Sequence, residues 1–357
     1  MPSLQNSRHL IIPGIILAGL AGVLIFGPGE DKAKGPADQQ PVRIGHFPNV
    51  THAQALVARA TGQYEKALGV PIKWSSFNAG PTAIEAIFAG EIDATYVGPN
   101  PAINGYIKSK GTSFVIVAGA ASGGAALVVA PHANITGTGD FTGKTLATPQ
   151  LGNTQDVAAR VWLAEHGHQP REKGGGVTIT PLANPDQLLL FQKKEIDAAW
   201  TVEPWVSRLE QEAGGRVLVD EATLWPNGRY TTTLLVMSRK FLVERPTAAR
   251  KLIAAHIDIT RQINEDRATS QRQISEQIKI LTTKTLPEPV LTSALKRIEF
   301  TWDPVGSSLL KVAEDAHQIG FIREKPVLEG IFALDGLNEA LKARKLPIVP
   351  PVIPAEK

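Results

Sequence analysis

Three features of this sequence predict an α/β protein of two similar lobes, each a mostly parallel sheet flanked by helices. Short apolar segments alternate with segments of helical periodicity along most of the chain. The length of 357 residues is sufficient for two separate hydrophobic cores. One pattern is also written twice, as FAGEIDATYVGP over residues 88–99 and as FQKKEIDAAWTVEP over residues 191–204. We interpret the two copies as the same helix, tight turn and strand in each lobe.

The first series of elements begins with a buried strand at residues 42–47. A helix follows over THAQALVARATG, where Thr51 suits the N-cap position and Gly62 suits the end. The next expected elements are a strand from Pro71, a helix from Pro81, a strand from Ile92, a helix after Pro101 and a strand from Phe114. This order favours a parallel sheet that is covered on both faces.

A second series starts after the apolar segment at residues 125–131. It continues with a strand at residues 143–149, a helix from Asn153 and a strand at residues 177–182. The next helix has Asn184 as its cap and Pro185 at its first position, and the strand IDAAW then repeats the earlier IDATYV. The C-terminal part is predicted to be helical, and His256 is expected there as a hydrogen-bonded helix residue rather than a ligand.

The carboxylates of the repeated pattern, Glu91, Asp93, Glu195 and Asp197, invite an acid–base interpretation. They precede the strands, however, whereas ligands in open α/β sheets bind beyond the carboxyl ends of strands. We therefore predict that these residues are structural. The functional loops are expected after the strands, at residues 97–102 and 201–205.

Composition and charge exclude several classes of function. The net charge is +3 and the Lys and Arg residues are scattered, so the sequence predicts no nucleic-acid partner. The chain has no cysteine, which excludes disulfides, thiolate metal sites, a cysteine nucleophile and a lipoprotein acyl anchor. The eight histidines show no metal-binding spacing. We expect no metal, no other cofactor and no catalytic residue, and we expect a monomer.

The N-terminal segment predicts an export signal or a membrane anchor. An apolar run at residues 10–26 follows Arg8 and precedes a polar stretch at residues 27–40. The run is slightly shorter than the roughly 20 residues that span a bilayer, and no A-x-A cleavage site follows it. We expect residues 1–40 to be a cleaved signal with its linker, with a retained anchor as the alternative. The mature domain then begins near Val42 and works outside the cytoplasm.

The corner TPQLGNTQ, at residues 148–155, is the strongest candidate for anion binding. A strand ends near Pro149 and a helix starts near Asn153 or Thr154, so unpaired N–H groups and the positive end of the helix dipole meet there. Gln150, Asn153 and Thr154 are candidate ligand residues, and Gly152 permits close approach. Asn153 or Thr154 could instead only cap the helix.

Other corners supply further candidates. Asn49 and His52 lie near the first helix start, and Asn100 precedes the helix that follows VGPNPA. Ser122 and Gly123 belong to the small-residue run GAASGGAAL. Each has an alternative role: surface packing for His52, helix capping for Asn100 and hinge motion for the small-residue run.

The segment TVEPW suggests a side-chain cluster. Trp205 could cover the organic tail of a solute, and Glu203 could bind an amine or hydroxyl group on it. Glu203 could equally cap the helix that Pro204 begins. Trp200 is expected in the core, and Arg229 is a further conceivable anion partner.

Four segments together give the sequence its family resemblance. GHFPNVTHAQALVARATGQYEKALG, FAGEIDATYVGPNPAI, FTGKTLATPQLGNTQDVAARVWLAEHG and FQKKEIDAAWTVEPW occur in this order with the usual spacing. In these features the chain resembles the periplasmic solute-binding proteins of ABC importers for aliphatic sulfonates, taurine and nitrate, over residues 42–267.

The resemblance implies a type II periplasmic-binding-protein fold, in which two crossing strands form the hinge and a cleft closes on a solute. Residues 125–131 and 231–241 suit the crossings. Lobe one would then comprise residues 41–127 and 234–357, and lobe two residues 128–233.

The resemblance also implies a function. The protein would capture a sulfonate or taurine-like anion and deliver it to an ABC permease and its ATPase at the inner membrane. Nitrate, bicarbonate or a pyrimidine precursor are alternative solutes. An enzyme on the same scaffold is a weaker alternative. The resemblance also extends to a few enzymes with this fold, but these enzymes depend on cysteines, and this chain has none.

Overall fold

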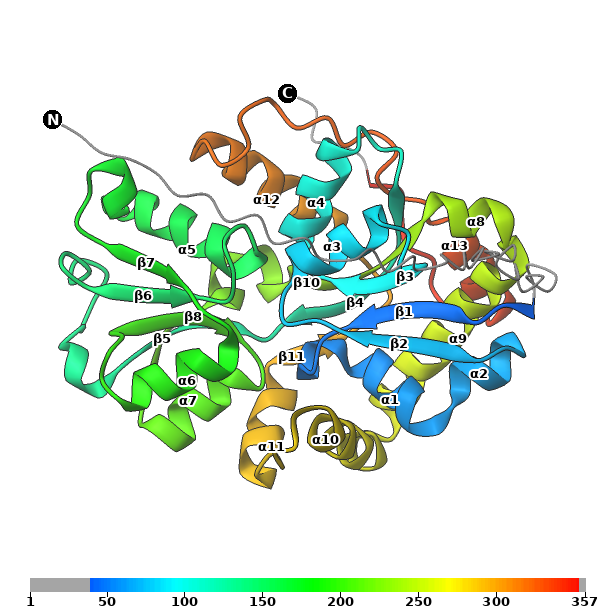
Figure 1. Cartoon of the computed structure of the whole chain (residues 1–357), viewed down its shortest axis with the longest axis horizontal. Helices are drawn as coiled ribbons and strands as arrows, with labels where there is room; N and C mark the ends of the chain where they lie inside the picture. Colours follow the sequence, from blue (N-terminus) through cyan, green and yellow to red (C-terminus); the bar gives the residue numbers. More distant parts are fainter. Residues whose placement is uncertain (1–38, 353–357) are drawn as a thin grey trace, which may run out of the picture. The chain divides into compact units, whose positions relative to one another are not determined.

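The computed structural model describes residues 39–352, which form two mixed sheets with helices on their faces (Figure 1). The predicted signal or anchor at residues 10–26 lies outside the described residues. Within residues 39–352, no helix combines the length and the apolar character that crossing a membrane requires. The lobe boundaries given above stay predictions.

The first sheet has the strand order β11-β4-β10-β3-β1-β2. Strand β10 is antiparallel to both of its neighbours, and the pairings give β2, β1, β3 and β4 one common direction. The bounds are β1 Val42–His46, β2 Ile72–Ser76, β3 Ala94–Val97, β4 Phe114–Gly123, β10 Thr231–Ser238 and β11 Ile298–Phe300.

The second sheet repeats this plan in the order β7-β6-β8-β5-β9. Strand β5 is antiparallel to both β8 and β9, whereas β7, β6 and β8 are parallel. The bounds are β5 Ala125–Val129, β6 Thr145–Thr148, β7 Thr178–Pro181, β8 Ala198–Val202 and β9 Arg216–Asp220. The predicted fold class, with its mostly parallel strands in two sheets, is thus confirmed.

Helices cover both faces of each sheet (Figure 1). Those between the strands of the first sheet are α1 Ala53–Thr61, α2 Gln63–Leu68, α3 Gly80–Phe88 and α4 Pro99–Lys108, with the 3-10 helix η2 Val50–His52. Those of the second sheet are α5 Thr154–Glu165, α6 Asn184–Gln192 and α7 Trp205–Ala213, with η3 Pro131–Ala133, η4 Arg171–Lys173, η5 Glu221–Leu224 and η6 Pro226–Gly228. The C-terminal part adds α8 Arg239–Glu244, α9 Pro246–Glu265, α10 Arg267–Thr282, α11 Glu288–Lys296, α12 Gly306–Gln318 and α13 Asp335–Ala343.

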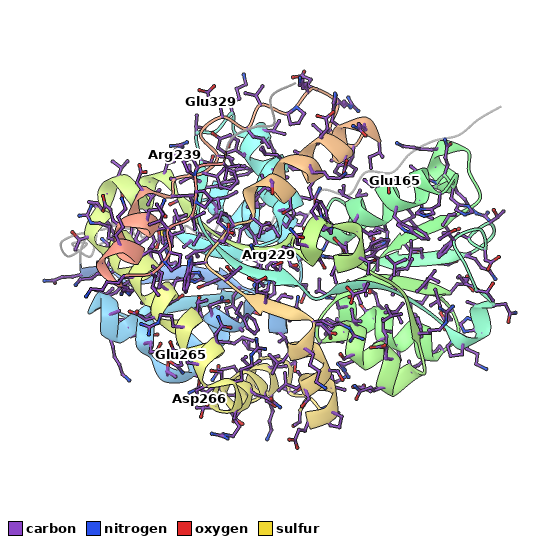
Figure 2. The ribbon with its side chains drawn as sticks, turned by 180° about the vertical axis from the view of Figure 1, so that it is seen from behind. Glu165, Arg229, Arg239, Glu265, Asp266 and Glu329 are labelled. Atoms are coloured by element: carbon purple, nitrogen blue, oxygen red, sulfur yellow. The ribbon has the colours of Figure 1, made fainter. Side chains whose placement is uncertain are left out.

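The strand periodicity divides the apolar side chains between separate cores. In β10, Leu235 and Met237 join the core under α1, α9 and α10, whereas Leu234 and Val236 join the core under α3, α4 and α12. The second sheet has its own core, which includes Trp162 and Trp200. Charged side chains such as Arg239, Glu265 and Glu329 lie on the outside (Figure 2).

The aspartates of the repeated pattern have equivalent structural positions. The Asp93 carboxylate accepts a hydrogen bond from the backbone N–H of Arg43 at 2.8 Å, at the start of β1. The Asp197 carboxylate accepts one from Thr145 at 2.8 Å, at the start of β6. Each aspartate therefore fixes the beginning of the parallel strand beside its own, which explains why the pattern occurs twice.

The chain passes between the sheets at two places. It leaves β4 at Gly123 and enters β5 after Gly124, and both glycines have positive φ. It returns between β9 and β10. Both passages come just before the segments 125–131 and 231–241, whose strands β5 and β10 each lie wholly within one sheet.

The Glu221 carboxyl lies inside the second-sheet half, where its Oε2 accepts a hydrogen bond from Trp200 Nε1 at 2.8 Å. Burial, aided by the charge of Asp220 and opposed by the Trp200 hydrogen bond, raises the pKa of Glu221 from 4.5 to about 7. The folded state therefore keeps a proton that the unfolded state releases between these two pH values.

We predict that Glu221→Gln changes how stability depends on pH. As pH rises from 4.5 to 7, the wild type should lose stability relative to the variant by a total of about 3 kcal/mol, and the difference should then level off. Denaturant unfolding of both proteins at several pH values measures this difference. Because the buried histidines are common to both proteins, their contributions cancel. A difference that does not vary with pH would contradict the prediction.

Candidate functional site

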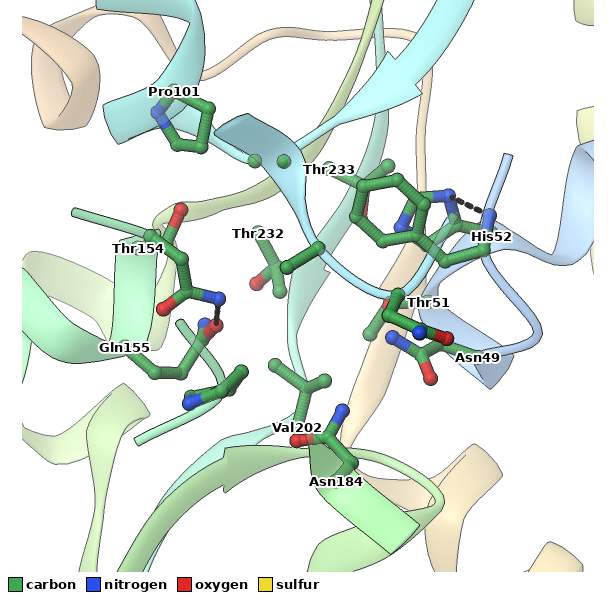
Figure 3. Close-up of a pocket in the computed structure, with 17 residues that line it drawn as sticks. Asn49, Thr51, His52, Pro101, Thr154, Gln155, Asn184, Val202, Thr232 and Thr233 are labelled. Atoms are coloured by element: carbon green, nitrogen blue, oxygen red, sulfur yellow. Dashed lines mark hydrogen bonds between the residues drawn. The ribbon is translucent and has the colours of Figure 1, made fainter. Parts of the chain in front are cut away.

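A cavity lies between the loops that follow the parallel strands of the two sheets (Figure 3). Its empty volume is about 390 Å³. Residues that follow β1, β2 and β3 meet residues that follow β6 and β7, together with the end of β8 and the start of β10. The lining residues are Phe47, Asn49, Thr51, His52, Asn78, Ala79, Gly80, Gly98, Pro101, Pro149, Asn153, Thr154, Gln155, Asn184, Val202, Thr232 and Thr233.

The starts of several helices converge on this cavity. Helix α3 begins at Gly80 and α4 begins at Pro99 on the side of the first sheet. Helices α5 and α6 begin at Thr154 and Asn184 on the side of the second sheet. Because a helix start presents N–H groups and a positive partial charge, the cavity has the potential that suits an oxyanion.

None of the lining residues is Asp, Glu, Lys or Arg. The one titratable side chain is that of His52, whose pKa burial lowers well below its ordinary value, with a smaller effect from His46. The neutral ring accepts a hydrogen bond from Phe47 N at its Nδ1 (3.3 Å) and stacks on the Phe47 ring at 4.3 Å. Uncharged donors, acceptors and helix ends therefore determine the chemistry of the cavity.

Two hydroxyl groups face this cavity without a partner. Thr154 Oγ1 on α5 and Thr233 Oγ1 on β10 are buried, and neither makes a hydrogen bond within the protein. An unsatisfied buried polar group costs about 1–3 kcal/mol. These two hydroxyls, one from each side of the cavity, are therefore candidate donors to a ligand.

The predicted corner at residues 149–155 both caps its helix and lines the cavity. Asn153 Oδ1 accepts a hydrogen bond from Asp156 N at 3.0 Å, and Asn153 Nδ2 donates to Gln155 Oε1 at 3.2 Å. Asn153 is thus the cap, and the Thr154 hydroxyl is not used in capping. Gln150 does not line the cavity, and its carbonyl oxygen accepts from Asn153 N at 3.0 Å.

Asn49 lines the cavity, and Trp205 holds it in place. The indole Nε1 of Trp205 on α7 donates to Asn49 Oδ1 at 3.1 Å, and Arg208 covers the indole ring at 4.8 Å. Trp205 itself does not line the cavity. This contact joins the two sides of the cavity rather than forming an aromatic wall against it.

The Glu203 side chain is fully buried and does not line the cavity. Its carboxylate accepts hydrogen bonds from Ser207 N at 3.1 Å and Ser207 Oγ at 2.9 Å, and it pairs with Arg297 at 2.9 Å. Burial raises the pKa of Glu203, although Arg297 and Ser207 oppose the shift. The Glu203 carboxylate therefore caps the first turn of α7, as the alternative prediction stated, and does not lie where a solute could bind in the cavity.

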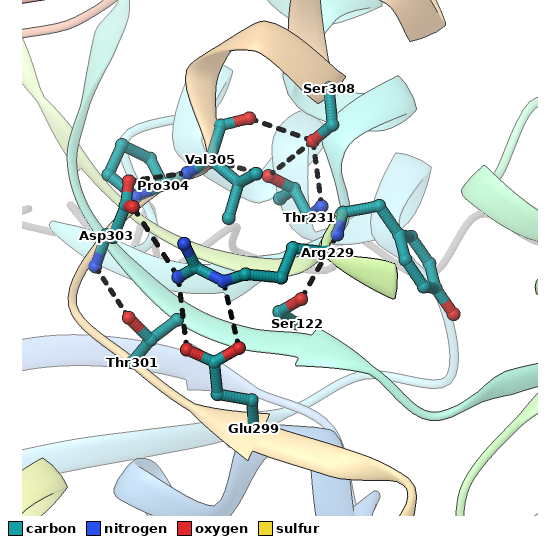
Figure 4. A network of polar contacts seen from close by, with 10 residues as sticks. Ser122, Arg229, Thr231, Glu299, Thr301, Asp303, Pro304, Val305 and Ser308 are labelled. Carbon is teal, nitrogen blue, oxygen red and sulfur yellow. Dashed lines mark hydrogen bonds and ion pairs between the residues drawn. The ribbon is translucent and has the colours of Figure 1, made fainter. Parts of the chain in front are cut away.

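Ser122 and Arg229 lie at the crossing region (Figure 4), and Gly123 follows Ser122 as the last residue of β4. Ser122 Oγ accepts from Tyr230 N at 3.1 Å, and the Gly123 carbonyl accepts from Thr232 Oγ1 at 2.6 Å. The Arg229 guanidinium makes two 3.0 Å hydrogen bonds to Glu299. These contacts tie β4, β10 and β11 together, and none of the three residues lines the cavity.

Asn100 lies at the start of α4 and faces a second cavity, which is described below. Of the predicted ligand residues, the structure therefore brings together Asn49, His52, Asn153 and Thr154.

Several cavity residues were not predicted as ligand residues. The sequence pattern assigns no ligand role to Asn78 and Gln155, and it assigns Asn184 only a role as a helix cap. Their position after a parallel strand is the feature that could have identified Asn78 and Asn184 as site residues. Asn78 follows β2 and Asn184 follows β7, just as Asn49 follows β1.

Comparison with known proteins agrees with this architecture. Residues 35–279 match the model of the NMT1-like family, which is more than half of the chain. This chain belongs to the NMT1-like family. Among solved structures, this NMT1-like protein resembles the periplasmic nitrate-binding protein of Synechocystis PCC 6803, with a TM-score of 0.75 and 15% identity over 87% of this chain and 90% of that one.

Two further relatives are named as an alkanesulfonate-binding protein and a taurine-binding periplasmic protein. The alkanesulfonate-binding protein of Xanthomonas axonopodis pv. citri, bound to MOPS, has a TM-score of 0.69 and 19% identity over 82% of this chain and 98% of that one. The taurine-binding periplasmic protein of Escherichia coli (strain K12) is 26% identical over 204 residues, 57% of this chain and 61% of that protein. This match thus spans about three fifths of the taurine-binding relative. The predicted periplasmic-binding-protein fold is confirmed, and all three relatives are binding proteins rather than enzymes.

We predict that Gly98→Ala pushes the two sides of the cavity apart. Gly98 has an ordinary φ of −72°, so alanine is not strained there, but its Cβ would overlap Thr154 Oγ1. Overpacking of this kind typically costs about 1–3 kcal/mol of unfolding free energy. Adding Thr154→Ala removes the overlapping oxygen and should restore much of the loss in chemical denaturation. An equal loss in the single and double variants would contradict the prediction.

We predict that Glu203→Ala lowers stability without changing which solute binds. The substitution leaves Arg297 and Ser207 without their buried partner, at a cost of about 3–5 kcal/mol. Glu210→Ala is the matched control, because Glu210 pairs with the same Arg297 at 2.8 Å but is partly exposed, and it should cost about 1 kcal/mol or less. If Glu203→Ala instead altered solute preference at unchanged stability, its carboxylate would belong to the binding site.

Proposed function

We propose that this NMT1-like protein is the extracytoplasmic solute-binding component of an ABC importer and that it captures a sulfonate or taurine-like oxyanion. The observation that carries the proposal is the pair of unpartnered buried hydroxyls, Thr154 and Thr233, which face one cavity from opposite sides. Helix starts from both sheets surround the same cavity. The fold and the sulfonate and taurine relatives support the choice of solute class.

The mechanism follows from the distribution of donors. A sulfonate oxygen that accepts from Thr233 leaves its other oxygens for Thr154 and the N–H groups at the start of α5. Such a solute bridges the two sides, so it binds more strongly when they are close together. A ligand shifts a conformational equilibrium only by this difference in affinity, and here the difference favours the closed form. A permease and its ATPase would receive the solute from that form.

The uncharged lining is compatible with an anion. Neutral N–H and O–H donors and helix dipoles stabilise negative charge without requiring a buried cation, whose own desolvation would be unfavourable. The same lining favours one second candidate, an uncharged heterocycle such as a pyrimidine precursor. Nitrate and bicarbonate offer the same oxygen acceptors and are the smaller alternatives among anions.

We predict that Thr154→Val and Thr233→Val each weaken sulfonate binding about tenfold, since each removes one hydrogen-bond donor to the solute. Isothermal titration with methanesulfonate, taurine, nitrate, bicarbonate and pyrimidines measures this effect on the domain from Pro41 onward. The melting temperature of the ligand-free protein should not fall, because neither hydroxyl has a partner in the protein.

Thr232→Val is the matched control. Its hydroxyl donates to Gly123 O at 2.6 Å, so its loss should destabilise the ligand-free protein. If no anion binds and a pyrimidine does, the heterocycle replaces the oxyanion as the solute. If Thr154→Val and Thr233→Val leave affinity unchanged, the hydroxyls do not contact the solute.

A further inference from the structure

A second, larger cavity adjoins the first. Its empty volume, which includes space open to solvent, is about 730 Å³. It lies between α5, α12, the 3-10 helix η5 and the segment that leads into β10. Thr154 lines both cavities, so its side chain forms part of the wall between them.

The lining of the second cavity is mainly apolar and aromatic, in contrast to the first. Helix α5 contributes Val157, Ala158 and Val161, and α12 contributes Val312. On the opposite side Trp225 stacks on Tyr230, with ring centroids 5.7 Å apart and an angle of 10° between the planes. A surface of this kind favours a hydrocarbon or aromatic group over water.

Three of the four Asp, Glu and Lys side chains of this lining have local partners, and the fourth, Glu165, is exposed to solvent. Lys311 pairs with Asp315 at 2.6 Å and lies over the Trp225 ring, whereas the Glu221 carboxyl accepts from Trp200. None of these groups therefore requires a charged ligand for compensation.

Two buried donors at the junction have no partner. Asn100 Nδ2 at the start of α4 is unpaired, and Asn100 is only 1% exposed. Thr154 Oγ1 is also unpaired and lies within the same lining. Since buried donors are nearly always satisfied, this junction is suited to a ligand oxygen.

We infer that the second cavity receives the organic body of a ligand whose oxyanion is held in the first cavity. The inference rests on the proposed function and narrows its solute class to oxyanions that carry a long aliphatic or an aromatic group. The anionic head contacts Thr233 and the helix starts, Thr154 lies at the junction, and the body packs between α5 and Trp225.

The test compares methanesulfonate, hexanesulfonate and 2-phenylethanesulfonate by isothermal titration. Each methylene that enters the second cavity should tighten binding roughly fourfold, so hexanesulfonate should bind at least a hundredfold more tightly than methanesulfonate. Ala158→Phe fills the cavity from α5 and should remove most of this preference while methanesulfonate affinity stays within about threefold.

Ala164→Phe is the matched control, since Ala164 is an exposed residue of the same helix that does not line the cavity. The Ala164→Phe variant should prefer hexanesulfonate over methanesulfonate by the same factor as the wild type. If Ala158→Phe does not fold, Leu224→Trp fills the cavity from the other side at a position that is already 43% exposed.

The outcomes separate the two proposals. If methanesulfonate and the longer sulfonates bind equally and Ala158→Phe has no effect, the inference about the second cavity fails. The proposed solute-binding function is then unaffected. Toluene serves as a probe that can fill only the second cavity. If toluene binds at the same time as methanesulfonate, and hexanesulfonate does not displace it, the second cavity is an independent site and the inference also fails. If no sulfonate binds at all, the proposed oxyanion function fails first.

Discussion

The direction of the parallel strands is the constraint on which the candidate site depends. In each sheet these strands end at the edge that faces the other sheet, and after every one of them except β4 the chain turns there into a helix. Helix starts therefore meet from both sides, with their N–H groups directed into the same space. The antiparallel strands β10 and β5 add to this arrangement, because they connect the two sheets through the passages that precede them.

Specific side-chain contacts hold the two sides together around this space. Trp205 from the second-sheet half donates to Asn49 from the first, and Arg297, next to β11, reaches Glu203, next to β8. Both contacts lie outside the cavity lining or at its margin. They limit how the sides approach one another, and they leave the cavity itself free of charged groups.

Much of this organisation could be predicted from sequence, for identifiable reasons. The strands and helices follow from apolar periodicity, and the candidate corners follow from the rule that ligands bind beyond strand ends. This rule predicts the positions of Asn49, Asn153 and Thr154, all of which line the cavity. Local pattern could not determine which way a side chain turns when its partner is distant in sequence. Glu203 is an example, because its orientation depends on Arg297, 94 residues further along the chain. Ser122 is a second example, because its hydroxyl oxygen accepts a hydrogen bond from the backbone N–H of Tyr230, which is distant in sequence.

The uncharged lining of the first cavity has a consequence for the kinetics of exchange. Long-range attraction between fixed charges accelerates the encounter of a charged ligand with its site and makes the rate depend on ionic strength. Here the positive potential comes from helix ends, which act within about one turn, so capture relies on short-range contacts. When the two sides of the first cavity move apart, the solute loses hydrogen bonds to uncharged donors only. In the proposed function, the solute can therefore leave without the disruption of an ion pair, which suits transfer to a permease.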